Sequence, residues 1–200
     1  MEETIPQNTT ENQTQSSGFF KGTLLMIWEF LKIVIIALII VLPIRYFLFQ
    51  PFIVKGDSMV PNFHSGDYLI IDEISYRVTS PHRGDVVVLK YPLDAAQRFI
   101  KRVVGLPGET VEVINGKVKI NSGGEEIILD EHAYLPAGLA TDGIVQITLG
   151  KDEYFVMGDN RQYSYDSRRW GVLPRADIIG RAALRLFPLT AVSFIGAPSY

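Results

Sequence analysis

The stretch TVEVINGKVKIN, residues 110–121, decides the fold class. Its two arms alternate apolar and polar residues, and they flank the pair Asn115-Gly116. An Asn-Gly pair between alternating arms is a strong signal for a hairpin with a type I′ turn, because both turn residues adopt positive φ. The stretch therefore predicts two antiparallel strands joined by a tight turn.

The same period of two recurs along the chain after Val54, with frequent turn signals between the segments. No long helical periodicity interrupts it, apart from a helical turn near 174–178. Many short strands with regular turns predict a mainly β domain of folded-over, barrel-like antiparallel sheets. The predicted strands are 67–72, 84–91, 98–105, the two arms of 110–121, 126–130, 143–149 and 153–159, with a last strand at 179–189 that returns to the core.

The composition narrows the function classes. The 200 residues are 47% hydrophobic and 20% charged, with a formal net charge of −3, so the chain lacks the basic footprint of a nucleic-acid-binding protein. Cysteine is absent, which excludes disulfides, thiolate metal sites and cysteine nucleophiles. The three histidines, His64, His82 and His132, have no metal-ligand spacing. We therefore expect no nucleic acid, no metal and no cofactor.

The N-terminal quarter differs from the rest. Residues 1–22 are mainly polar and are predicted to be disordered. Residues 23–50 are mainly apolar, and a helix of this length rises far enough to span a bilayer of about 30 Å. The short uncharged core, 33–44, would also fit a signal peptide or a buried helix, but the bulky residues that follow it do not form a cleavage site. We therefore predict an uncleaved transmembrane anchor at 23–50 and a β domain at 51–200.

Ser58 and Lys101 form the first candidate site. Ser58 lies in GDSMVPNF, residues 56–63, just beyond the apolar segment, where it is either an ordinary turn residue or a nucleophile. Strand alternation in FIKRVVG, 99–105, places Lys101 on a face that is otherwise apolar. Such a lysine either extends its ammonium group into water or is desolvated, and a desolvated, neutral lysine can take the proton of a serine. Ser-Lys pairs are a known variant of the nucleophile–base arrangement.

The polar run GDNRQYSYDSRRWG, residues 158–171, is the second candidate segment. It is either an exposed loop or a set of groups that orients a nearby amine. Serine hydroxyls both accept from an ammonium and donate to a neutral amine, and Asp166 and Arg168 can form an ion pair. Other hydrolase patterns are missing: GxSxG fails at Val60, and SxxK does not occur.

Together, GDSMVPNF, FIKRVVGLPGE and GDNRQYSYDSRRWG resemble the signature motifs of type I signal peptidases, the membrane-anchored serine proteases that remove signal peptides. The resemblance covers about residues 30–187. Two departures stand in the first motif: Asn62-Phe63 replaces Thr-Leu, and Gly56 replaces the serine that some members carry. The second departure leaves the Ser58 backbone amide as the expected oxyanion donor.

The resemblance implies a role for each matching residue. Ser58 attacks the scissile carbonyl, Lys101 acts as the general base, and Ser164 orients the lysine. It further implies a supporting ion pair and loop (Asp166 and Arg168, with Asp159 and Asn160) and a pocket for small residues in the Ala-x-Ala pattern, lined by Phe52, Val54, Met59, Phe63, Leu69, Val88, Phe99 and Ile100.

The resemblance also implies location and partners. The charged residues around the apolar core are balanced and give no orientation, but the family places the N-terminus in the cytoplasm and the catalytic domain outside it, in a single-pass protein of the cell membrane. Its partners would be the lipid bilayer and preproteins emerging from the secretion machinery. Two alternatives remain: a self-cleaving Ser/Lys protease of the repressor type, and an anchored β module that binds exported peptides without cleaving them.

Overall fold

The computed structural model describes residues 14–43 and 49–198. These fall into two compact units, an N-terminal helix and a β domain, which we describe separately. The helix is α1 (Thr14–Pro43). It begins at Thr14 rather than at the predicted residue 23, and it ends at a proline, which disfavours continuation of a helix. The prediction for residues 1–13 lies outside the described residues.

The side chains described along α1 are largely apolar and exposed between Leu25 and Val41. Lys32 and Glu29, one turn apart, form an ion pair of 2.7 Å. In the part of the chain that the structure describes, no helix meets the combined requirement of length and apolar character for crossing a membrane. Phe49 and Gln50, which the prediction assigned to the end of the anchor, lie instead in the first strand, because their backbone pairs with Ile71 and Asp72.

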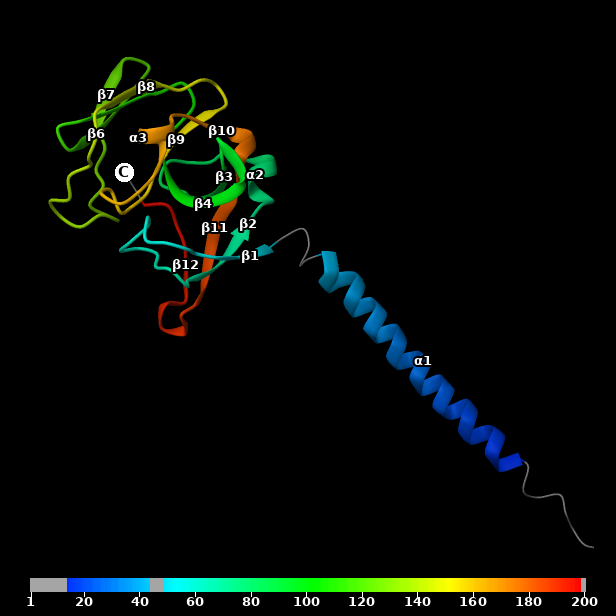
Figure 1. Ribbon diagram of the computed structural model, residues 1–200. Coiled ribbons are helices and arrows are strands. Elements are labelled where there is room, and N and C mark those ends of the chain that lie inside the picture. The colour runs from blue at the N-terminus through cyan, green and yellow to red at the C-terminus, as the bar shows by residue number, and fades with distance from the viewer. Residues whose placement is uncertain (1–13, 44–48, 199–200) are drawn as a thin grey trace, which may run out of the picture. The chain divides into compact units, whose positions relative to one another are not determined.

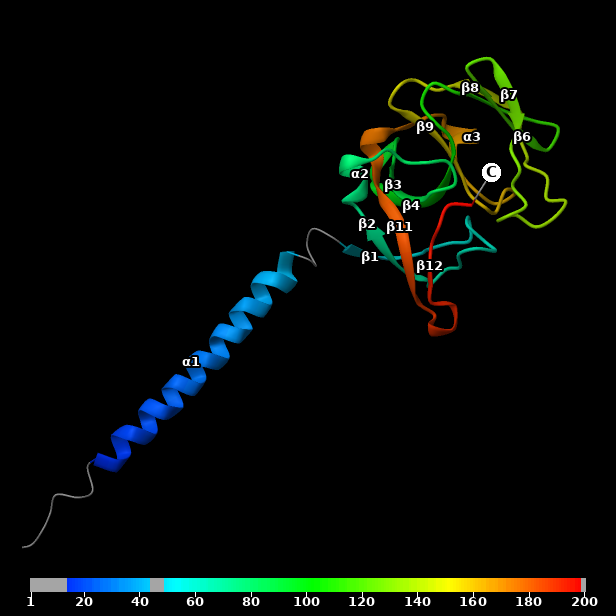
Figure 2. The ribbon, with the colours of Figure 1, turned by 180° about the vertical axis from the view of Figure 1, so that it is seen from behind.

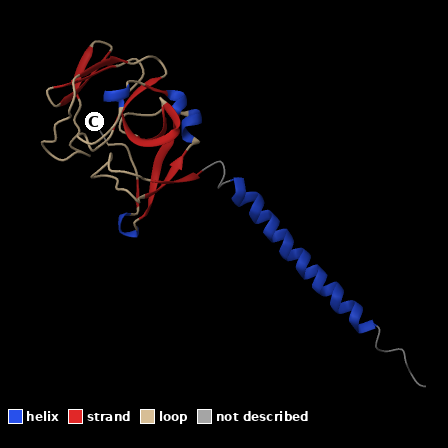
Figure 3. Ribbon diagram, viewed as in Figure 1, coloured by secondary structure: helices blue, strands red, loops and turns tan. Residues whose placement is uncertain are grey.

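The β domain contains two antiparallel sheets, which confirms the prediction of a mainly β fold (Figure 3). Its helical segments are short: α2 (Ser75–Val78), α3 (Ser167–Trp170), η2 (Arg175–Asp177) and η3 (Leu189–Ala191). The larger sheet contains, in spatial order, β1 (Phe49–Ile53), β2 (Tyr68–Asp72), β11 (Ile178–Phe187), β3 (Val86–Tyr91), β4 (Asp94–Gly105), β9 (Glu153–Met157) and β10 (Leu173–Pro174), with β12 (Ser193–Phe194) paired to β11. The smaller sheet contains β7 (Glu125–Ile128), β6 (Lys117–Ser122), β5 (Thr110–Ile114) and β8 (Val145–Thr148).

The predicted hairpin forms the centre of the smaller sheet. Asn115 and Gly116 have φ of 52° and 76°, as a type I′ turn requires, and the register pairs Val113 with Val118. The other predicted strands are also confirmed, most of them with shorter ends. β4 is longer than predicted and starts at Asp94, because residues 94–97 are exposed and lack the alternation by which a half-buried strand is recognised.

The two sheets share a core. One buried cluster combines Val111 and Val118 of the smaller sheet with Phe155 and Met157 of β9, so that the smaller sheet packs on the larger one. Figures 1 and 2 show β6, β7 and β8 at one end of the β domain and β1, β2 and β12 at the other. β4 lies between β3 and β9 in the larger sheet, and residues 100–105 of this strand are all buried. Side chains on this part of β4 are therefore held in fixed positions.

Replacing Gly116 tests the hairpin turn. Gly116→Ala puts a Cβ on a residue with positive φ, only 3.0 Å from the Cβ of Ala140, and the left-handed region costs an L-residue about 1–2 kcal/mol. We expect urea denaturation of the detergent-purified protein to show a loss of that size. Gly196→Ala is the matched control, because nothing lies within 4 Å of its added Cβ and its φ is not positive. Equal losses in both variants would contradict the turn assignment.

Candidate active site

Ser58 lies in a tight turn, residues 56–63, that follows β1. The Phe63 N–H donates to the Met59 carbonyl at 2.9 Å, and the side chains of both residues are buried in the core. The buried side chains of Met59 and Phe63 therefore anchor the turn in the core, while Ser58 itself is only half-buried. This arrangement presents the serine hydroxyl from a rigid support.

Lys101 meets this hydroxyl from β4. Its Nζ donates to Ser58 Oγ at 2.7 Å, and only 3% of the lysine is exposed. Burial lowers the pKa of Lys101 from 10.5 to about 8, although the nearby carboxylates of Asp166 and Asp159 oppose this shift. The neutral form of the lysine therefore becomes populated as the pH approaches 8, and a neutral Nζ at this distance can accept the serine proton.

Residues 158–160 bind the carbonyl side of the serine turn. The Asn160 backbone N–H donates to the Ser58 carbonyl at 3.0 Å, and Asn160 Nδ2 donates to the Asp57 carbonyl at 2.9 Å. Gly158 passes so close that a Cβ there would lie 2.3 Å from the Ser58 carbonyl oxygen and 2.2 Å from Ser164 Oγ. Only glycine allows this contact, and the contact joins the turn to the polar loop predicted at 158–171.

Asp166 and Arg168 form the predicted ion pair. Arg168 Nε and Nη2 each donate to the Asp166 carboxylate at 2.8 Å, and the Gly158 N–H donates to it at 3.0 Å. Burial alone would raise the pKa of Asp166, but these donors outweigh it and keep that pKa below its ordinary value. Asp166 therefore stays ionised and fixes the backbone at Gly158.

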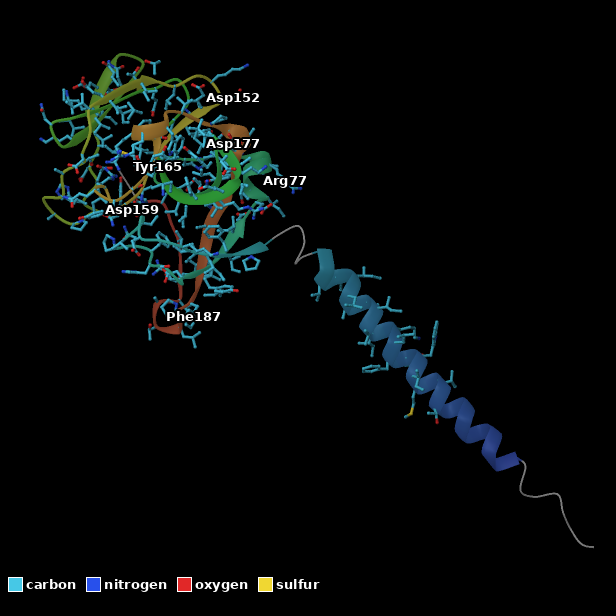
Figure 4. All side chains as sticks on the ribbon, viewed as in Figure 1. Arg77, Asp152, Asp159, Tyr165, Asp177 and Phe187 are labelled. Atoms are coloured by element: carbon cyan, nitrogen blue, oxygen red, sulfur yellow. The ribbon has the colours of Figure 1, made fainter. Side chains whose placement is uncertain are left out.

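Ser164 is buried beside Gly158. Among the described residues, no hydrogen bond joins its hydroxyl to Lys101, so its predicted role in orienting the lysine stays a prediction. Figure 4 labels two residues of this loop, Asp159 and Tyr165, which come between β9 and α3 in the chain.

Asp159, predicted only to shape the loop, is fully buried and has a partner that sequence reasoning missed. Arg102 Nε and Nη2 donate to its carboxylate at 2.8 and 2.6 Å, and Asn62 Nδ2 donates to it at 2.8 Å. Strand alternation places Arg102 on the face opposite Lys101, with Ile100 and Val104, and a buried guanidinium requires a carboxylate. That signal was sufficient to predict a partner for Arg102, though not its identity.

Arg161 is a second missed residue. It is 1% exposed, and it donates to the Gly158 carbonyl at 3.1 Å and to Thr141 Oγ1 at 2.6 Å. Its guanidinium also forms an ion pair of 2.5 Å with Glu131. Arg161 thus ties residues 131–141, which follow β7, to the loop that holds Ser58. No sequence signal identified Glu131 or Thr141 as its partners.

A cavity of about 300 Å³ opens at the dyad. A larger cavity, of about 490 Å³, lies near the β5–β6 turn, but Ser58 and Lys101 line only the smaller one, to which we assign the site. No cluster of three or more potential metal-ligating side chains occurs among the described residues. The smaller cavity is lined by Phe52, Ile53, Lys55, Ser58, Ala96, Arg98, Phe99, Ile100 and Lys101.

Three of the eight predicted pocket residues, Phe52, Phe99 and Ile100, therefore lie on the cavity wall. The others are absent from this wall and are buried in one core cluster that also contains Ile100 and contacts Phe52: Val54, Met59, Phe63, Leu69 and Val88. They shape the cavity indirectly, because Phe52 and Ile100 of its wall pack on them. Sequence analysis missed four other residues of the wall, Ile53, Lys55, Ala96 and Arg98.

Comparison with known proteins agrees with these motifs. The family model described as "Signal peptidase, peptidase S26" matches residues 27–187. "Probable signal peptidase I-1" of Synechocystis sp. is 40% identical over 85% of this chain and 89% of its own length. "Signal peptidase I" of Leptolyngbya laminosa is 36% identical, with coverages of 85% and 84%, and "Signal peptidase I P" of Bacillus subtilis subsp. natto is 37% identical, with coverages of 82% and 91%.

A crystal structure of a signal peptidase I from Enterococcus faecalis aligns with a TM-score of 0.44 and 29% identity, over 53% of this chain and 99% of that chain.

The buried lysine predicts an unusual dependence of stability on pH. Between about pH 8 and 10.5 the unfolded chain holds a proton on Lys101 that the folded chain has lost. The free energy of unfolding therefore rises with pH across this window. Below about pH 8 the folded chain carries the full cost of burying the charged lysine. The shift corresponds to about 3 kcal/mol, and the lost hydrogen bond to Ser58 offsets about 1 kcal/mol.

We therefore expect Lys101→Met to be more stable than the parent by about 2 kcal/mol at pH 7, with a difference that shrinks as the pH approaches 10.5. Urea denaturation at several pH values measures it. Lys90→Met, which removes an exposed lysine from the neighbouring strand, is the control and should show no such trend. A destabilised Lys101→Met at pH 7 would mean that burial does not lower the pKa of Lys101 in the folded protein.

Proposed function

This chain belongs to the signal peptidase family, peptidase S26, and from this premise we propose that it is a serine endopeptidase that removes signal peptides from exported preproteins after Ala-x-Ala sequences. The observation that carries the proposal is the 2.7 Å hydrogen bond between Ser58 Oγ and Lys101 Nζ. The burial of that lysine gives it the low pKa that a general base needs. A module that only binds peptides has no use for this arrangement.

The reaction has two steps, the formation of an ester on Ser58 and its hydrolysis. Ser58 Oγ attacks the scissile carbonyl while neutral Lys101 takes the hydroxyl proton, and the resulting ammonium gives this proton to the leaving amine. The signal peptide is then held as an ester on Ser58. Water attacks the ester with Lys101 again as the base, and Ser58 regains its proton as the peptide leaves. The Ser58 backbone amide is the proposed donor to the oxyanion.

The loop around Asn160 prepares the serine for this attack. Asn160 donates to the carbonyls of both Asp57 and Ser58, so it fixes the two peptide units that flank the nucleophile's Cα. Gly158 permits the close approach, and Asp166 holds the Gly158 N–H. Because these groups are already ordered before the substrate binds, less conformational freedom has to be lost on reaching the transition state.

The cavity wall supports the proposed preference for small residues. Phe52, Phe99 and Ile100 are bulky. Phe52 and Ile100 pack in one buried cluster and Phe99 packs against another, so these side chains cannot move away from the cavity. A large side chain would therefore overlap the wall, whereas discrimination among small side chains stays modest, at about 1–3 kcal/mol per methylene.

The proposed function includes a membrane anchor at residues 23–43 of α1, with a cytoplasmic N-terminus. In its support, large apolar side chains from Leu25 to Val41 are exposed along α1, and apolar surface of this extent is expected to be covered. A preprotein's apolar segment lies in the same bilayer, so its cleavage point emerges at a fixed height. A nucleophile that follows an anchor by only a few residues in the chain would meet that point with little loss of translational freedom.

Removing either member of the dyad tests the mechanism. Ser58→Ala and Lys101→Met should each lower kcat/KM for a detergent-solubilised Ala-x-Ala preprotein by at least about 1000-fold, because neither variant can form and resolve the ester. Ser122→Ala and Lys90→Met, at exposed positions of the same residue types, should retain parental activity. A preprotein with Phe before the scissile bond is the substrate control. Cleavage that survives in both dyad variants would exclude this mechanism.

The pKa of Lys101 sets the pH dependence. Since only neutral Lys101 accepts the serine proton, kcat/KM should rise about tenfold per pH unit below about pH 8 and level off above it. Steady-state rates between pH 5.5 and 9.5 measure this, in Lys90→Met as well as in the parent. A flat profile with rate-limiting chemistry would show that another group is the base.

A further inference from the structure

Two cations line the cavity that contains the dyad. Lys55 lies between β1 and Ser58, and Arg98 lies in β4, three residues before Lys101. Both side chains are exposed, so a peptide in the cavity can reach them. No aspartate or glutamate is among the nine residues that line it.

Neither cation takes part in an ion pair formed within residues 14–43 and 49–198. The arginines around the catalytic loop differ in this respect: Arg102, Arg161 and Arg168 each bind a carboxylate of the protein. Lys55 and Arg98 are therefore available to a ligand at no loss of an internal ion pair, in a chain whose net charge is −3.

The residues that Arg98 meets outside the dyad cavity do not neutralise its positive charge. Arg98 also lines a neighbouring cavity of about 270 Å³ together with Glu73 and Lys90. Two cations and one carboxylate thus line that cavity, and the three side chains together carry a net positive charge. The positive field at the dyad cavity therefore persists.

Spacing along the chain limits where a bound carboxylate would lie. An extended segment advances about 3.3 Å per residue, so three residues place Arg98 about 10 Å from Lys101, and Lys55 at most about 10 Å from Ser58. An extended substrate covers the same distance in three residues, and long side chains reach about one residue further.

We propose that Lys55 and Arg98 are specificity-determining residues that recognise an acidic side chain within four residues of the scissile bond. This inference rests on the proposed function and names the substrates that the site prefers among those with Ala-x-Ala sequences. Opposite charges in a partly apolar cavity attract the substrate and increase kcat/KM, and salt screens the effect because both cations are exposed.

The test uses the full chain in a neutral detergent and a series of Ala-x-Ala peptides. Each of the four positions on either side of the scissile bond carries Asp, Asn or Lys in turn. At low ionic strength we expect kcat/KM at one or more positions to be about fivefold higher for Asp than for Asn, as for an exposed ion pair, and lower for Lys. This order should collapse to ratios near 1 in Lys55→Gln/Arg98→Gln and in 0.5 M NaCl.

Two further variants sharpen the result. In Lys55→Glu/Arg98→Glu the preference should invert in favour of Lys peptides. Lys151→Gln/Arg77→Gln is the matched control, because it removes the same two charges from exposed positions outside the cavity, with Arg77 on α2 (Figure 4), and it should keep the parental order.

The outcomes separate the two proposals. If the parent does not cleave the neutral Asn peptide, the proposed function fails. If that peptide is cleaved and substrate charge has no effect, or has the same effect in both Gln variants, this inference alone is overturned. Loss of binding to anionic lipid vesicles in Lys55→Gln/Arg98→Gln, with no effect of peptide charge, would likewise overturn it and assign the two cations to a lipid surface.

Discussion

The hydrogen bond between a buried lysine and a half-buried serine is the interaction on which this active site depends. An amine can serve as a base only if it loses its proton near the working pH, and desolvation on β4 achieves this for Lys101. Two carboxylates, Asp159 and Asp166, lie close enough to favour the charged form. Each is bound by its own arginine. These ion pairs limit the field of the carboxylates at Lys101 while they keep the loop in place.

The rest of the β domain holds the two partners at this distance. Lys101 is fixed because β4 lies inside the larger sheet, with β3 on one side and β9 on the other. Ser58 is fixed because Met59 and Phe63 anchor its turn in the core, and because Asn160 binds the carbonyl side of that turn. The strand β9 leads directly into Gly158, so one element supports both the lysine strand and the serine turn.

Sequence reasoning succeeded where local pattern and chemistry agree. Alternation predicted the strands and the unusual position of Lys101, and Asn115-Gly116 predicted the turn. It failed where the signal is non-local: Glu131 and Arg161 are 30 positions apart, and nothing near Glu131 indicates which cation it binds. The residues of the cavity wall were the hardest to predict. Val54, Leu69 and Val88 have the pattern of pocket residues but face the core. Lys55 and Arg98 cannot be told from ordinary surface cations in the sequence. The strands β10 and β12 have only two residues each, too few to show a period of two. The strand β1 overlaps the apolar segment that was predicted to be the anchor.

A neutral base also restricts where the site can place charge for recognition. An anionic side chain bound in contact with Lys101 would favour its protonation and raise its pKa, which would reduce the fraction of active enzyme at neutral pH. An exposed carboxylate about 10 Å from Lys101 is one Debye length away in 0.1 M salt, so it raises the pKa of Lys101 only a little. Cations placed three residues from the dyad, as Lys55 and Arg98 are, can therefore attract an acidic substrate without charging the base. Cations adjacent to the scissile bond would bring the substrate's negative charge onto Lys101, so recognition by charge has to act from a distance in an enzyme of this kind.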